Sequence, residues 1–292
     1  MSTSSRFDRF IGNVSLNAAQ RQEAQDRVKS VASKLNERYY PNVAYTGSTK
    51  LLIGSHAKRT RVRPPRDVDM VFIMPILQYK RYDEYAGNGQ SQMLQDVRAV
   101  IAQRYPSTSI SGSGRVVDVK FTNGHSVQVV PAFEVTGKFL LADSHDGGSW
   151  QLSNYREEAA FVDRSDKRTA GNTRKLIKML KVWQQECNVP IKSIVLELRA
   201  VNFLKDWPHA SKSSTYHDWM MRDFFKELLN YTNGTCKIPG IDEKCQYGDA
   251  WAAKVRRAYA NALEACEDEA SSYEYLATEH WQKIFGSMYV GP

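Results

Sequence analysis

At 292 residues, the chain is long enough to bury one large hydrophobic core or two modest ones. Its hydrophobic content of 42% and charged content of 25% are ordinary for a globular protein, and no run of about 18 apolar residues predicts a membrane span. The net charge of +8 favours polyanionic partners, either nucleic acid or several triphosphates. Four irregularly spaced cysteines argue against a disulfide framework or a zinc cluster, and the first residues lack the apolar core of a signal peptide. We therefore expect a cytoplasmic protein with reduced thiols.

The first predicted element is a long helix over residues 15–39. Ser15 is its candidate N-cap, and Pro41 stands just beyond the last residue that helical spacing supports. A second helix is predicted over residues 91–104. Apolar residues recur at helical spacing on one side of it: Leu94, Val97 and Ile101.

Between these helices, Gly54-Ser55 is followed by Asp67 and Asp69. Asp67 opens an apolar strand predicted to run to about Met74, and side chains alternate along a strand, so the two carboxylates share one face. Adjacent carboxylates repel each other unless a cation lies between them, and the hard ions Mg²⁺ and Mn²⁺ prefer oxygen ligands. The Gly-Ser pair predicts a tight turn whose N–H groups and hydroxyl suit phosphate oxygens. Together these residues predict a site for a metal-bound nucleoside triphosphate.

A β-hairpin is predicted after the second helix. Its strands cover residues 116–121 and 126–130, and Asn123-Gly124 is a strong signal for a two-residue turn between them. In a hairpin of that kind Val119 lies opposite Gln128, and Asp118 faces the other side of the sheet.

From about residue 153 onward the sequence predicts mostly helices. The most informative runs from Asn172 to Cys187, where an apolar side lies opposite a basic side that carries Arg174, Lys178 and Lys181. A basic side of this kind is also typical of an ordinary solvated helix face. The other helices are predicted at residues 193–203, 215–230, 249–266 and 272–284, with a loop over residues 233–248.

The segment from Gly54 to Asp69 resembles the nucleotide-binding motif of DNA polymerase β-like nucleotidyltransferases. Within them it is most similar to the group of bacterial CD-NTases, oligoadenylate synthetases and cyclic GMP-AMP synthase. Three other segments resemble the family's third catalytic strand, helical spine and carboxy-terminal helix: residues 127–133, 175–198 and 281–286. The resemblance implies an α+β fold in which a mixed nucleotidyltransferase sheet is followed by a helical domain, with the active site in the cleft between them. The expected domains are residues 1–150 and 151–292, with the helix over residues 15–39 packing on both.

The resemblance also implies a reaction. A metal-dependent nucleotidyltransferase of this group makes a cyclic or linear oligonucleotide second messenger from ATP or other NTPs, as part of antiphage signalling. Asp67 and Asp69 are the expected catalytic residues and metal ligands of a site for two Mg²⁺ or Mn²⁺ ions, where a ribose hydroxyl attacks an α-phosphate. The expected nucleotide-binding residues are Gly54, Ser55, Lys178, Lys181 and Ser193. Some bacterial members need an activator such as a HORMA-domain protein, whereas direct activation by DNA is not expected, because no zinc-ribbon insertion is present.

One position departs from the family pattern. Gln128 stands just before Val-Val-Pro-Ala, where the family usually has an acidic residue. Its amide oxygen can ligate a metal ion but supplies no charge, and a hairpin with the predicted register leaves Asp118 on the wrong face to replace it. Two alternatives stay open, and only the second follows from Gln128. One is a nucleotidyltransferase that acts on an RNA or protein acceptor, and the other is a non-catalytic nucleotide-binding relative.

Overall fold

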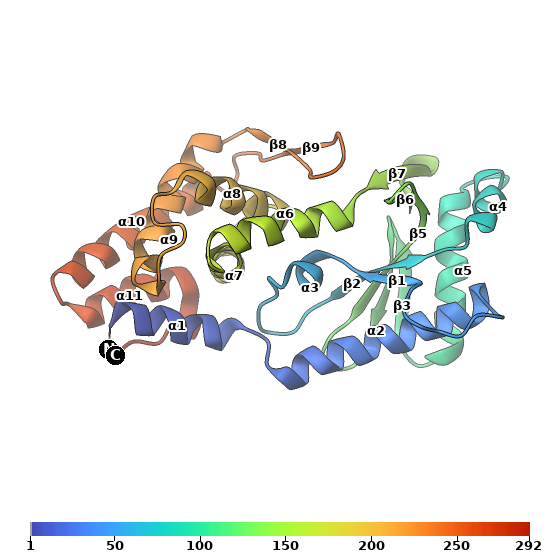
Figure 1. The fold of residues 1–292 in the computed structure, drawn as a ribbon, viewed down its shortest axis with the longest axis horizontal. Helices are drawn as coiled ribbons and strands as arrows, with labels where there is room; N and C mark the ends of the chain where they lie inside the picture. Colours follow the sequence, from blue (N-terminus) through green and yellow to red (C-terminus); the bar gives the residue numbers. More distant parts are fainter. Residues whose placement is uncertain (1) are drawn as a thin grey trace.

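A seven-stranded mixed sheet forms the centre of one half of the molecule, and the structure, a computed structural model, describes residues 2–292 (Figure 1). The strand order is β1-β2-β5-β4-β3, with β6 beside β5 and β7 beside β6. Among the described strands of this sheet, β2 and β5 form the one parallel pair. The strands are β1 (Lys50–Leu52), β2 (Val68–Ile73), β3 (Ser109–Ser113), β4 (Val116–Lys120), β5 (Val127–Val135), β6 (Lys138–Asp143) and β7 (Ser149–Ser153).

Two helices, α2 (Ala18–Tyr39) and α5 (Gly89–Arg104), cover one face of this sheet. The alternate residues of β2, β4 and β5 that point toward them are buried valines and a methionine: Val68, Met70, Val117, Val119, Val127 and Val129. The predicted strand after Asp67 and the predicted helix over residues 91–104 are both confirmed. Because side chains alternate, the polar residues between the valines point to the opposite face, toward the helical half of the molecule.

The predicted helix over residues 15–39 is confirmed as α2, which begins at Ala18, and a separate helix that was not predicted precedes it over residues 3–14. α1 (Thr3–Val14) ends at Ser15, whose backbone N–H caps it, and α2 begins after Asn17. Ser15 is therefore not the N-cap of α2. Asn17 takes that role, because its side chain accepts a hydrogen bond from the backbone of Gln20, whose side chain in turn accepts one from the backbone of Asn17.

The hairpin of β4 and β5 has a different register from the one predicted. Asp118 lies opposite Gln128 and Val119 opposite Val127, so the register is shifted by one residue. A shift of one residue moves every side chain to the other face. The expectation that Asp118 faces away from Gln128 is therefore wrong. The connection spans residues 121–126 rather than two residues, and α2 holds it through Arg27, which donates hydrogen bonds to the His125 carbonyl and the Asn123 side chain.

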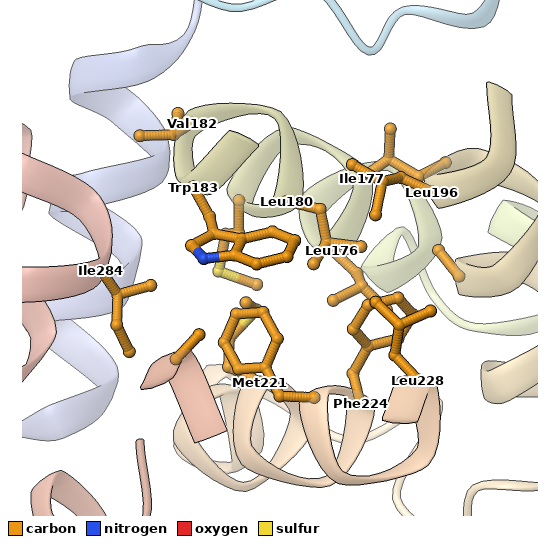
Figure 2. Close-up of a cluster of buried hydrophobic side chains, with 14 of the residues drawn as sticks. Leu176, Ile177, Leu180, Val182, Trp183, Leu196, Met221, Phe224, Leu228 and Ile284 are labelled. Atoms are coloured by element: carbon orange, nitrogen blue, oxygen red, sulfur yellow. The ribbon is translucent and has the colours of Figure 1, made fainter. Parts of the chain in front are cut away.

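The second half of the chain is helical, as predicted. Its helices are α6 (Tyr155–Arg168), α7 (Asn172–Glu186), α8 (Ser193–Asp206), α9 (His217–Leu228), α10 (Ala252–Ala270) and α11 (Glu274–Phe285). Figure 2 shows their core, in which the apolar side of α7 faces α9 and Trp183 lies among Leu180, Met221 and Ile284. The segment predicted as a loop over residues 233–248 contains a short hairpin, β8 (Thr235–Lys237) and β9 (Lys244–Gln246).

Helix α1 belongs to the helical core although it begins the chain. Phe7 and Phe10 are fully buried there, against the rings of Trp281, Phe285 and Tyr289. In Figure 1, α1 and α2 run along one side of the molecule and link its two halves. The division into domains at residue 150 stays a prediction. Across residues 2–292, none of the helices has the length and apolar character needed to cross a membrane.

Candidate nucleotide site

A cleft of about 780 Å³ opens between the sheet and the helical half. Its walls come from α3 (Gly54–Lys58), the start of β2, helices α7 and α8, and the connection between those two helices. Its volume lies within the range of small-molecule sites. Six of the predicted site residues line it: Gly54, Ser55, Asp67, Asp69, Lys181 and Ser193.

The glycine at the start of α3 makes room for a carboxylate. Gly54 has φ +58°, and a Cβ built on it would lie 2.4 Å from Oδ2 of Asp69. The Asp69 carbonyl also accepts a hydrogen bond from the backbone of Ile53 at 3.0 Å, so the two segments are held together. The predicted tight turn is therefore the first turn of a short helix. The first N–H groups of a helix have no helical carbonyl to pair with, and Ile53 at the N-cap supplies no side-chain hydrogen bond to them.

The two aspartates carry a charge that the site does not fully compensate. Burial, together with the neighbouring Asp67, raises the pKa of Asp69 to about 6, although Lys181 and Lys58 act to lower it. Burial and the charge of Asp118 likewise raise the pKa of Asp67. Both carboxylates are therefore in surroundings where an added cation is favourable.

The donor chemistry of this pair fits a hard divalent ion. Asp67 and Asp69 offer carboxylate oxygens, the ligands that Mg²⁺ and Mn²⁺ prefer. Over residues 2–292, no three His, Cys, Asp or Glu side chains are already arranged around a common metal position. Gln128 lies outside the lining of the cleft, and its Nε2 donates a hydrogen bond to Oδ2 of Asp67 at 3.2 Å. In this orientation Gln128 presents a donor, and not a metal-ligating oxygen, to the aspartate.

A buried ion network, which was not among the predicted site features, lies at the base of the cleft. Glu197 accepts from Lys58 at 2.8 Å and from Lys181 at 2.7 Å, and all three side chains are less than a tenth exposed. Burial alone would raise the pKa of Glu197, but the two lysines outweigh it and hold that pKa at about 2. Lys58 also reaches Glu158 at 3.1 Å, and Lys181 donates to Thr60 at 3.1 Å. The signal was available in the sequence, since Glu197 is the one acid in the otherwise apolar start of the helix at residue 193.

The other predicted phosphate-binding residues differ in placement. Lys178 does not line the cleft, and its Nζ donates to the Ser15 hydroxyl at 2.9 Å. Ser193 lines the cleft, and its hydroxyl donates to Gln184 at 2.9 Å. Among the arginines that follow the Gly-Ser pair, Arg61 and Arg66 line the cleft.

One histidine beside the Gly-Ser pair is neutral. Burial, followed by the interactions with Arg61, His125 and Lys181, lowers the pKa of His56 to about 3. His56 is therefore a neutral hydrogen-bonding group of the cleft at physiological pH. It adds no charge to the basic residues around it.

Comparison with known proteins gives one matching family. Residues 1–165 match the family described as Second Messenger Oligonucleotide or Dinucleotide Synthetase domain. A probable cyclic nucleotide synthase of Bacillus cereus (strain VD146) is 22% identical, over 97% of this chain and 96% of the relative.

Solved structures share the fold. CdnC of E. coli MS115-1, solved with ATP, superposes with a TM-score of 0.69 at 17% identity, over 99% of both chains. E. coli DncV, bound to 3'-deoxy GTP, superposes with a TM-score of 0.70 at 15% identity, over 95% of this chain and 93% of the other. The CD-NTase CdnG of Bradyrhizobium diazoefficiens, in complex with GTP, gives 0.70 at 12% identity, over 97% and 96%. The α+β nucleotidyltransferase fold expected from the sequence is therefore confirmed.

Proposed function

Because the chain belongs to the Second Messenger Oligonucleotide or Dinucleotide Synthetase family, we propose that it joins ATP or other NTPs into a cyclic oligonucleotide second messenger. The observation that carries the proposal is the meeting of Asp67 and Asp69 with Gly54-Ser55 and Lys181 in one cleft. The related probable cyclic nucleotide synthase of Bacillus cereus supports it. We propose a place in antiphage signalling in the cytoplasm as part of the same function.

The residues of the cleft form two groups, one that binds phosphate and one that binds metal ions. Ser55 and the N–H groups at the start of α3 hold the triphosphate, and Lys181 adds charge-assisted hydrogen bonds to its oxygens. Ser193 completes the phosphate site from the opposite wall. Asp67 and Asp69 would hold the metal ions.

The chemistry supplied by a bound pair of Mg²⁺ or Mn²⁺ ions is a lower pKa for the attacking ribose hydroxyl and charge neutralisation on the departing pyrophosphate. The chain's own contribution is to align that hydroxyl with the α-phosphate and to fix the charges around it before reaction. The basic side chains of Lys181, Arg61 and Arg66 compensate the triphosphate, so the site needs no large rearrangement of charge to accept its substrate.

A protein activator belongs to the proposal as well. CdnC of E. coli MS115-1 has also been solved in a complex with HORMA-deltaN. That CdnC structure superposes on 99% of this chain with a TM-score of 0.68. We therefore include a HORMA-domain protein among the activators to be tested with this chain.

The test is product analysis by mass spectrometry. The purified protein, alone and with a HORMA-domain protein, is incubated with all four NTPs in Mg²⁺ and separately in Mn²⁺. We expect cyclic oligonucleotides from the wild type and none from D67N/D69N, while Asp26→Asn, an exposed change on α2, leaves the products unchanged. Equal product from D67N/D69N would contradict the proposal, as would transfer of nucleotides to an added RNA or protein with no free oligonucleotide.

A further inference from the structure

We propose that Asp118 supplies the third carboxylate of the metal site, from strand β4 instead of the neighbouring strand β5. The proposal rests on the function proposed above and names a further metal-binding residue of the same site. It follows from the register of three adjacent strands. At the family's acidic position on β5 this chain has Gln128, which brings no charge.

The strand register aligns the polar side chains across the sheet. Asp69 on β2 lies opposite Gln128 on β5, and Gln128 lies opposite Asp118 on β4. Residues that are directly opposite in neighbouring strands share one face, so Asp118 points to the same side as Asp69. Its neighbours Val117 and Val119 are fully buried on the other face, in the core beneath α2 and α5. Asp118 therefore faces the half of the molecule that contains the cleft.

Asp118 has a free ligand atom. Its Oδ1 is buried and has no hydrogen-bond partner among the described residues. The other oxygen, Oδ2, lies 3.5 Å from Nζ of Lys120, whose side chain is 61% exposed. An exposed pair of this kind contributes little, whereas a buried carboxylate oxygen without a partner is unfavourable. A cation would satisfy that oxygen.

Gln128 lies between Asp69 and Asp118 in the sheet. Its amide group donates a hydrogen bond to Oδ2 of Asp67. Asp67 therefore lies next to Gln128, which itself stands between Asp69 and Asp118 in the strand register. Asp67 and Asp69 line the cleft, while Asp118 lies beside it. In this arrangement Asp69 would hold one ion, Asp118 would hold the other, and Asp67 would contribute to both. Two ions held by three carboxylates carry less uncompensated charge than two ions held by two.

The test counts bound ions. Mn²⁺ is titrated into wild type, Asp118→Asn and D118N/Q128D in the presence of a non-hydrolysable ATP analogue, and free Mn²⁺ is followed by electron paramagnetic resonance. We expect two ions for the wild type. For Asp118→Asn we expect the second ion to bind at least about tenfold more weakly, since even the loss of an indirect support for a ligand costs that much. D118N/Q128D places the acid on β5 and is expected to restore the second ion, which a purely structural role for Asp118 does not predict.

Controls separate this inference from the proposed function. Glu134→Gln removes a partly exposed acid of β5 that pairs with Arg156 outside the cleft, and it is expected to leave both ions in place. Melting temperatures establish that each variant is folded. Two tightly bound ions in folded Asp118→Asn would overturn the role of Asp118 while leaving the proposed function intact. If the wild type itself binds no Mn²⁺ with the ATP analogue, both proposals are wrong.

Discussion

Asp69 is held in surroundings that disfavour its charge. It is partly buried beside Asp67, and its carboxylate approaches the backbone of Gly54 so closely that no side chain fits between them. These surroundings raise its pKa to about 6 from a reference value of 3.8. Residues at functional sites often carry such an unfavourable charge, because the ligand that relieves it is part of the function.

The pKa of Asp69 gives a pH-dependent stability of the metal-free protein. The folded state binds the proton of Asp69 more tightly than the unfolded state, so this group stabilises the fold most below about pH 4, and the gain is lost as the pH rises through about 6. Asp69→Asn has no such charge to bury. We expect the free energy of unfolding of Asp69→Asn to exceed that of the wild type by about 1–2 kcal/mol at pH 7.5, so the variant is the more stable protein. The difference should shrink toward pH 4.

Denaturant unfolding of both proteins in EDTA, from pH 4 to 8, measures this difference. Mg²⁺ with an ATP analogue should raise the melting temperature of the wild type more than that of Asp69→Asn, since a ligand stabilises only the state that binds it. An Asp69→Asn protein that is less stable than the wild type at pH 7.5 would mean that the charge of Asp69 is compensated without a metal ion.

Among the elements, α3, α7 and α8 are joined by one buried acid. Glu197 on α8 pairs with Lys58 at the end of α3 and with Lys181 on α7. All three residues line the cleft next to the segment proposed to bind phosphate, so the same contacts fix the positions of the three helices and of the lysine proposed to bind phosphate. Without the acid, two lysine charges would remain in a buried position with Glu158 as the remaining partner.

Glu197→Gln tests this link. We expect the free energy of unfolding to fall by about 3–5 kcal/mol, because removing one member of a buried ion network leaves the others uncompensated. A triphosphate restores negative charge beside Lys181, so an ATP analogue should raise the melting temperature of Glu197→Gln more than that of the wild type. Glu227→Gln, which breaks the partly exposed pair with Arg199, is the matched control and should show the wild-type response to the analogue. A smaller response in Glu197→Gln than in the wild type would argue that Lys181 does not contact the triphosphate.

The elements were predictable from the sequence where local pattern decides them. The apolar strand after Asp67 and the helices α5 and α7 follow from periodicity alone. The hairpin register could not be predicted in the same way. The Asn123-Gly124 pair favours a two-residue turn, but contacts with a helix distant in the sequence impose a longer connection. Arg27 and Glu23 of α2 bind the connection around His125, and that connection sets the register by which Asp118 meets Gln128. The network around Glu197 was missed for a similar reason, since its partners lie far apart in the sequence.

At the scale of the whole molecule, α1 brings the amino-terminal part of the chain into contact with the carboxy-terminal helices. The helical core and the core beneath α2 and α5 are built from different parts of the sequence, except that α1 and Val62 belong to the helical core. Arg6 is fully buried and pairs with Glu269 and Glu274, and Phe7 packs edge to face on Trp281 at 5.1 Å. The expected helical domain, residues 151–292, therefore includes α1 in its packing, and the segment between α1 and α2 contributes Leu16 to the cleft.

Phe7→Ala distinguishes two cooperative units from one. Truncating a fully buried phenylalanine should lower the free energy of unfolding of the core that contains it by about 3–5 kcal/mol. If the two cores unfold separately, amide hydrogen exchange should accelerate in α10 and α11, far along the sequence from the mutation, while β2 and β5 keep their protection. Arg9→Ala, on the exposed side of the same helix, is expected to change neither region. Equal loss of protection in the sheet would instead show that the cleft joins both halves into a single unit, and that the aspartates proposed as catalytic lose their positions whenever the helical core opens.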